Sequence, residues 1–133
     1  MRHNESSTQI ACYKWFSIQY PSYRGLLFSV PNGARVSRSQ AMVLRAEGLT
    51  SGVSDMILLV PRHGYHGLMI EMKTATGRQS DSQKQFQVAV EKQGYLYCIV
   101  RSCQQFMILV NAYLGEYVSD KEELRKMING KTK

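Results

Sequence analysis

Two carboxylates and one ammonium group are spaced so that a short hairpin would bring them together. Residues 55–60 and 67–72 are apolar runs typical of strands, and the stretch rich in Pro, Gly and His between them predicts an antiparallel hairpin. If the numbers of facing residues sum to about 128, Asp55 lies opposite Lys73, and Glu71 shares their face because side chains alternate along a strand. The spacing therefore predicts that the three charged groups cluster at one end of the hairpin.

Such a cluster has the chemistry of a divalent-metal site. Mg²⁺ prefers octahedral oxygen ligation and usually takes one or two protein carboxylates, with water and substrate phosphate in the other positions. Lys73 beside them would orient the nucleophilic water or stabilise charge on the phosphate. The alternative is that the three charges mark the solvated end of a hairpin. Glu71 favours the metal site, because it interrupts an apolar run and a carboxylate in mid-strand is unfavourable unless it is paired or metal-bound.

Three motifs around the hairpin resemble those of a nuclease superfamily. The segments GVSD, LMIEMK and GRQSDSQ, in this order, are similar to the PD-(D/E)xK nucleases and, within them, to the VRR-NUC (virus-type replication-repair nuclease) family. The PNG of residues 31–33 and the IVRS of residues 99–102 also fit, so the resemblance covers most of the chain. It implies a restriction-endonuclease-like α/β fold, a mixed β-sheet flanked by α-helices, and metal-dependent hydrolysis of phosphodiester bonds in DNA.

The resemblance also implies roles for individual residues. The positions that match the family's site are the catalytic triplet Asp55, Glu71 and Lys73, the Met72 carbonyl as a backbone metal ligand, the glutamine Gln83 and the first-helix acid Glu5. The metal ligands would then be Asp55, Glu71, Met72 and Glu5, and the ion would be Mg²⁺ or Mn²⁺. Ser54 stands where the family usually has a proline, which leaves the carboxylates that carry the chemistry in place.

Two of these residues also have an ordinary structural explanation. Glu5 lies in the first turn of a helix predicted to run from residue 4 to about residue 20, where a carboxylate interacts favourably with the helix dipole. Gln83 completes the Ser80-x-x-Gln83 spacing of a capping box at the start of a later helix. Both explanations stay open for Glu5, and Gln83 can serve both roles if its helix begins beside the strand of Glu71.

The remaining elements follow from apolar runs and turn signals. Further strands are predicted over residues 26–30 and 95–100, and further helices over residues 41–48, 80–94, 103–114 and 119–130. The strand–helix–strand unit from Glu71 to Val100 should be a right-handed parallel crossover. With no repeat or linker in view, we expect residues 1–133 to form a single compact domain, with a frayed tail at residues 131–133.

Composition limits the class of protein. A chain of 133 residues, 44% of them apolar, can bury one core, yet no stretch approaches the length of a membrane span and the N-terminus lacks the apolar region of a signal peptide. Cys12, Cys98 and Cys103 lack metal-ligand spacing and are expected to be reduced. We therefore expect a cytoplasmic, intracellular protein of a bacterial or phage-infected cell, neither secreted nor membrane-bound, with no small-molecule cofactor.

The charge balance suits a polyanionic partner. Basic residues outnumber acidic ones by 17 to 10, which gives a formal net charge of +7 and a pI near 9.5. The residues predicted to contact nucleic acid are Asn32, Arg35, Arg38, Arg78, Lys84 and Arg101. Each of them taken alone is also compatible with a solvated surface, because arginines on exposed helix faces usually contact only water.

These observations together predict a metal-dependent, structure-selective DNA endonuclease. Affinity that comes mainly from phosphate contacts favours recognition of DNA shape over sequence. The resemblance implies a homodimer that acts on four-way (Holliday) junctions or other branched DNA. It also implies a role in replication or repair, including that of phages. The alternatives are a flap or restriction-type nuclease, a ribonuclease on the same fold, and a basic DNA-binding module without catalytic activity. The intact carboxylate pair argues against the last, because binding alone does not require acids beside a phosphate.

Overall fold

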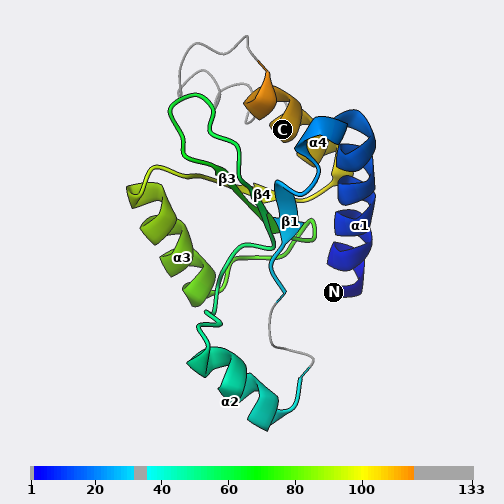
Figure 1. Ribbon diagram of the computed structural model, residues 1–133. Coiled ribbons are helices and arrows are strands. Elements are labelled where there is room, and N and C mark those ends of the chain that lie inside the picture. The colour runs from blue at the N-terminus through cyan, green and yellow to red at the C-terminus, as the bar shows by residue number, and fades with distance from the viewer. Residues whose placement is uncertain (1, 32–35, 116–133) are drawn as a thin grey trace.

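Residues 2–31 and 36–115 are described by a computed structural model (Figure 1). Within these ranges, four strands form one mixed sheet in the order β1-β2-β3-β4. The strands are β1 (Leu27–Ser29), β2 (Met56–Leu58), β3 (Leu68–Met72) and β4 (Leu96–Val100). The helices are α1 (Arg2–Gln19), the short 3-10 helix η1 (Pro21–Tyr23), α2 (Arg38–Ala46), α3 (Asp81–Lys92) and α4 (Cys103–Leu114). The predicted mixed sheet flanked by helices is confirmed.

The hairpin of β2 and β3 forms as predicted, but its register differs by two residues. Met56 pairs with Ile70 and Leu58 with Leu68, so facing numbers sum to 126 and not to about 128. The prediction that Asp55 lies opposite Lys73 is therefore wrong, because the observed register brings Asp55 level with Glu71. Because side chains alternate between the two faces of a strand, a shift of two residues leaves each side chain on the same face. The two acids therefore still share one side of the sheet.

The register has its physical cause in the hairpin tip. His63 and Gly64 both have positive φ, 55° and 82°, and Tyr65 N donates to Arg62 O at 2.8 Å, which is the geometry of a two-residue turn. Between the bridge Arg62–Tyr65 and the ladder, the chain has an extra residue on the β2 side. That extra residue displaces the pairing in the manner of a bulge, which no rule based on run lengths anticipates.

The parallel crossover is also present. Leu68 pairs with Leu96 and Met72 with Val100, so β3 and β4 run in the same direction and α3 connects them. Helix α3 lies against one face of the sheet, and α1 and α4 lie on the other (Figure 1). The predicted capping box starts this helix, because Ser80 Oγ accepts from Gln83 N at 3.2 Å.

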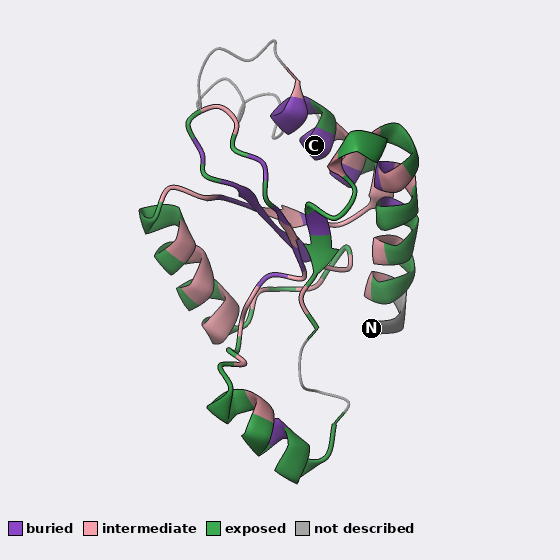
Figure 2. Ribbon diagram, in the orientation of Figure 1, coloured by how far each residue is buried: buried purple, intermediate pink, exposed green. Residues whose placement is uncertain are grey.

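The main core lies between the sheet and the helices α1 and α4. It includes Phe16 of α1, Phe106 and Tyr113 of α4, and Leu68 and Ile70 of β3, all at most 1% exposed. Helix α3 covers the other face, so all five residues of β3 are buried (Figure 2). A carboxylate at position 71 is therefore enclosed from both sides of a central strand.

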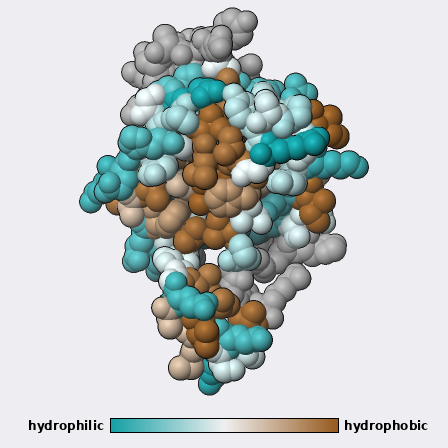
Figure 3. Space-filling model, viewed as in Figure 1, coloured by the Kyte–Doolittle hydropathy of each residue, from teal (hydrophilic) through white to brown (hydrophobic). Residues whose placement is uncertain are grey.

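Helix α2 projects away from the sheet. It starts at a capping box formed by Ser37 and Gln40, as the serine spacing predicts, and Ala41 is its only buried residue (Figure 2). Met42 and Val43 are exposed, and apolar side chains are visible on this part of the surface (Figure 3). The helix thus adds little to the core that positions the site.

Some expectations fall outside the described residues. These are the turn at residues 32–33, the C-terminal helix at residues 119–130 and the tail at residues 131–133. Among the described helices, none combines the length and the apolar character that a membrane crossing requires.

Candidate active site

Asp55 and Glu71 form a pair of adjacent carboxylates at the end of the hairpin. Asp55 directly precedes β2, and its Oδ2 accepts a hydrogen bond of 2.7 Å from the Met72 backbone N–H on the neighbouring strand. This contact holds the aspartate against the end of β3. The predicted convergence of the two acids is therefore real, although it is reached through a different register.

The environment of Glu71 is unfavourable for a negative charge. Its side chain is 2% exposed, and burial together with the hydrogen bond and charge of neighbouring Asp55 raises the pKa of Glu71 to about 9. The positive charge of Lys73 acts in the opposite direction and lowers this pKa. At neutral pH the pair therefore holds a proton unless a cation replaces it.

Both oxygens of Glu71 are held by hydrogen bonds from the α3 side. Gln83 Nε2 donates to Oε2 at 2.9 Å, and the Gln83 Oε1 accepts from the Ser80 N–H at 2.9 Å. The same side chain thus caps the helix and braces the acid, so the capping explanation is confirmed, and the catalytic role of Gln83 stays a prediction. The Tyr97 hydroxyl donates to Oε1 at 3.4 Å.

Sequence reasoning missed Tyr97 and its partner Gln79. Gln79 Nε2 donates to the Tyr97 hydroxyl at 3.3 Å and to Gln87 Oε1 at 2.9 Å, which extends a polar chain from Glu71 into α3. Tyr97 is 5% exposed, and its burial raises the pKa of its hydroxyl. Tyr97 pairs with Met69 in the parallel ladder, and Met69 lies two residues before Glu71, so Tyr97 is on the same face of the sheet as Glu71. The sequence could have indicated this contact only if the register of β3 and β4 had been known.

Met72 ends β3, and Lys73 follows it directly. Lys73 donates through its backbone N–H to Val100 O at 3.0 Å, which continues the parallel pairing by one residue. Its charge influences Glu71, so the ammonium lies in the neighbourhood of the acid pair. The roles of the Met72 carbonyl and of the Lys73 ammonium stay predictions.

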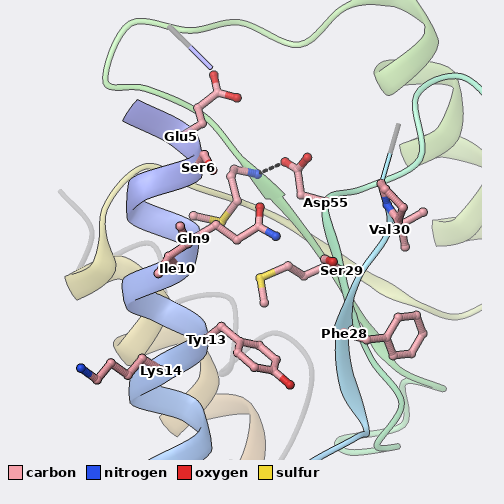
Figure 4. Close-up of a pocket in the computed structure, with 13 residues that line it drawn as sticks. Glu5, Ser6, Gln9, Ile10, Tyr13, Lys14, Phe28, Ser29, Val30 and Asp55 are labelled. Atoms are coloured by element: carbon pink, nitrogen blue, oxygen red, sulfur yellow. Dashed lines mark hydrogen bonds between the residues drawn. The ribbon is translucent and has the colours of Figure 1, made fainter. Parts of the chain in front are cut away.

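A cavity of about 800 Å³ opens beside Asp55 between α1 and β1 (Figure 4). Its lining residues are Glu5, Ser6, Gln9, Ile10, Tyr13, Lys14, Phe28, Ser29, Val30, Pro31, Asp55, Met56 and Met72. Glu5 and Asp55 therefore both line this cavity, and Glu71 is not among its lining residues. In the part of the chain that the structure describes, no three Asp, Glu, His or Cys side chains form a ready-made metal cluster. The metal role of Glu5 stays a prediction.

The donor chemistry of the acid pair fits Mg²⁺ or Mn²⁺. Hard divalent cations take oxygen ligands, and Mg²⁺ typically uses one or two carboxylates and keeps several waters. Asp55 and Glu71 supply two adjacent carboxylates. Burial is the main cause of the raised pKa of Glu71, and the charge of Asp55 adds a repulsion that a cation between them would relieve. Gln83 and Tyr97 would keep the glutamate oriented, as hydrogen bonds to metal ligands usually do.

Of the four described residues predicted to bind nucleic acid, three lie near the loop between β3 and α3, and Arg38 lies on another element. Arg78 and Lys84 are exposed close to the start of α3, and Arg38 is exposed on the projecting α2. Arg101 donates through Nη1 to the carbonyls of Thr74 and Gly77, at 2.7 Å each, so it braces the loop that follows β3. Asn32 and Arg35 lie outside the described residues. The nucleic-acid role of all six stays a prediction.

Comparison with known proteins agrees with this geometry. The family model of the VRR-NUC domain matches residues 3–104, a range that includes the acid pair and its braces. The chain belongs to the VRR-NUC family. A solved VRR-NUC domain protein superposes with a TM-score of 0.71 at 21% sequence identity, over 83% of this chain and 87% of that protein, and this likeness supports the fold alone. No curated protein matches the sequence. The VRR-NUC membership gives this chain a nuclease-type fold.

Proposed function

We propose that this VRR-NUC protein is a metal-dependent endonuclease that hydrolyses phosphodiester bonds in DNA. The observation that carries the proposal is the pair of adjacent carboxylates Asp55 and Glu71, of which Glu71 is 2% exposed and Asp55 is half-buried, with Lys73 directly after the strand of Glu71. A protein that only binds DNA gains nothing from two adjacent acids next to a phosphate. The family membership points to the same chemistry.

In this proposal the acids, their hydrogen-bond partners and Lys73 have different roles. Asp55 and Glu71 would hold Mg²⁺ or Mn²⁺, which supplies Lewis acidity and a lowered pKa for its water. Asp55 is oriented by the Met72 N–H, and Glu71 by Gln83, so neither ligand has to rearrange on binding. The Lys73 ammonium would hold the attacking water or stabilise the charge that develops on the phosphate.

The preferred substrate in this proposal is branched DNA, cut by a homodimer. The chain carries a net charge of +7, so phosphate contacts would supply most of the affinity and shape would supply selectivity. A two-fold dimer would match a four-way junction and place one acid pair on each of two strands.

Cleavage of a labelled panel tests the proposal. The panel contains a four-way junction, a flap, linear duplex, single-stranded DNA and RNA, each with Mg²⁺, Mn²⁺ or EDTA. Lys73→Ala should abolish cutting and retain binding, whereas Lys92→Ala, an exposed lysine in the last turn of α3, should leave both unchanged. Symmetric nicks in the junction, together with a dimeric mass in light scattering, would support the dimer.

The rival is a DNA-binding module without catalysis, and the same panel separates the two. Binding of every branched substrate without cleavage by wild type in either metal would exclude the nuclease. Removal of an acid by Asp55→Asn would then leave affinity for DNA equal or higher, because a negative charge next to phosphate is lost. Cleavage of RNA alone would instead identify a ribonuclease.

A further inference from the structure

The cavity beside Asp55 extends along α1 well past the acids. Its lining on this helix runs from Glu5 to Lys14, which at 1.5 Å per residue corresponds to roughly 13 Å. One end contains the acids Glu5 and Asp55, and the other contains Tyr13 and Lys14. The acid pair alone does not explain a space of about 800 Å³, because a hydrated metal ion and one phosphate fill only its end.

The side chains beyond the acids suit a flat heterocycle. Figure 4 shows Gln9 and Tyr13 extending from α1 into the space between this helix and β1. Met56 and Met72 form the apolar floor of the same space, each at most 1% exposed. Tyr13 is 43% exposed, so its ring has an open surface on which a base can stack.

Polar groups are present at the edges of this surface. Gln9 brings an amide that can donate and accept hydrogen bonds, and Ser29 brings a hydroxyl from β1. Lys14 lies at the far end of the lining, and its ammonium points away from this space (Figure 4). A ring face, an apolar floor and an amide together match a nucleobase better than they match a peptide or a lipid.

We propose that this cavity binds one unpaired nucleobase of the substrate strand, next to the phosphate addressed by Asp55. The base stacks on Tyr13 and meets the Gln9 amide at its edge. A base within a continuous duplex is covered by its neighbours and cannot enter, so the cavity selects DNA with an unpaired or readily unstacked nucleotide at the cut. This inference rests on the proposed nuclease function and gives that function its substrate class.

A binding cycle in the Lys73→Ala background tests the proposal without cleavage. Fluorescence anisotropy measures the dissociation constants of a splayed-arm DNA, the same DNA with abasic sites scanned across the branch, and a continuous duplex. Stacking of one base on an aromatic ring contributes about 1–3 kcal/mol, so Tyr13→Ala should weaken binding of the splayed-arm DNA by roughly 5-fold to 150-fold. Duplex binding should change less than about 2-fold, because duplex affinity comes from phosphates.

The decisive result is the lack of additivity. At one position of the scan, the abasic site should weaken binding as much as Tyr13→Ala does, and the combination should lose nothing more, because both changes remove the same contact. Tyr13→Phe, which keeps the ring, should bind like the parent. Ile18→Ala is the matched control, since Ile18 is 69% exposed on the same helix and does not line the cavity.

Other outcomes would overturn the inference. Equal weakening of splayed and duplex DNA by Tyr13→Ala would assign Tyr13 to general backbone binding, and a change of oligomeric mass in this variant would assign the cavity wall to contact with a second copy. Full additivity with every abasic site would exclude a base in the cavity. Tyr13-dependent binding of RNA in place of DNA would contradict DNA as the substrate class. If wild type cuts no nucleic acid, the nuclease proposal fails by itself, and the binding cycle still decides whether the cavity holds a base.

Discussion

Replacement of Glu71 by glutamine should stabilise the metal-free protein at alkaline pH. Folding raises the pKa of this carboxyl from 4.5 to about 9, because the side chain is buried next to Asp55. Between these two values the folded chain keeps a proton that the unfolded chain releases, so wild-type stability falls as pH rises. Glutamine carries no proton to lose, and its amide can donate to Asp55 as the protonated glutamate does.

The size of the effect follows from the same shift. A single proton gives a slope of at most about 1.4 kcal/mol per pH unit, or at most about 2.7 kcal/mol from pH 6 to pH 8. For a domain of this size such a difference corresponds to a melting temperature change on the order of 10 °C. The gap between Glu71→Gln and wild type should therefore be small at pH 5 and widen steadily towards pH 8.

Calorimetric or fluorescence melts in EDTA, across this pH range, measure the gap. Glu91→Gln is the matched control, because Glu91 is an exposed carboxylate on α3 and should follow the wild-type curve. Parallel curves for Glu71→Gln and wild type would refute the reasoning, since the pH trend would then come from other groups. Added Mn²⁺ should raise the wild-type melting temperature at pH 8 more than that of Glu71→Gln, because only wild type offers both carboxylates.

Three further predictions concern the groups that position the site. Tyr97→Phe removes the hydroxyl that donates to Glu71 Oε1 and should weaken Mn²⁺ binding in titration calorimetry by about 10-fold. Gly52→Ala should lower the free energy of unfolding in urea by at least about 1 kcal/mol, because φ is +84° and a Cβ would lie 2.3 Å from Ser82 O at the start of α3. Arg101→Ala should speed hydrogen exchange in residues 74–77, whose carbonyls would lose a charged donor.

Each of these predictions has its control. Tyr95→Phe changes a tyrosine on the same edge of the molecule that stacks against His66, and it should leave Mn²⁺ affinity unchanged. Gly48→Ala has the same kind of positive φ, +116°, with nothing within 4 Å of the new Cβ, so it should destabilise less than Gly52→Ala. Unchanged Mn²⁺ affinity in Tyr97→Phe would contradict the role of the Tyr97 hydroxyl. Equal losses of folding free energy in the two glycine variants would contradict the close approach at Gly52. Unaltered hydrogen exchange in Arg101→Ala would contradict the bracing of the loop.

Local signals predicted the elements well. The helix capped by Ser80 and Gln83, the apolar helix of residues 103–114 and the strand pair that brings Asp55 and Glu71 to one face all depend on short-range periodicity, side-chain capping and alternation. These properties act within one or two turns of chain, so they can be recognised without knowledge of the rest of the fold. The family resemblance rested on the same residues.

The register and the braces could not be predicted in this way. The pairing of the hairpin was displaced by an extra residue near the tip, and Arg101 donates to loop carbonyls far from it in sequence. Tyr97 reaches Glu71 only because α3 returns the chain to a parallel strand beside β3. The contacts of Arg101 and Tyr97 join segments separated by more than twenty residues, and their geometry depends on how the intervening chain packs.

The sequence by itself determined which charged groups are the candidates for the chemistry and that they share a face. Two carboxylates with a lysine two residues after one of them, on strands with a period of two, suffice for that. Only the tertiary structure decided how far the pKa of Glu71 is raised. Burial of Glu71 between two layers of helices, and the approach of Asp55 to it, raise its pKa to about 9, because desolvation and repulsion depend on three-dimensional distance and not on position in the chain.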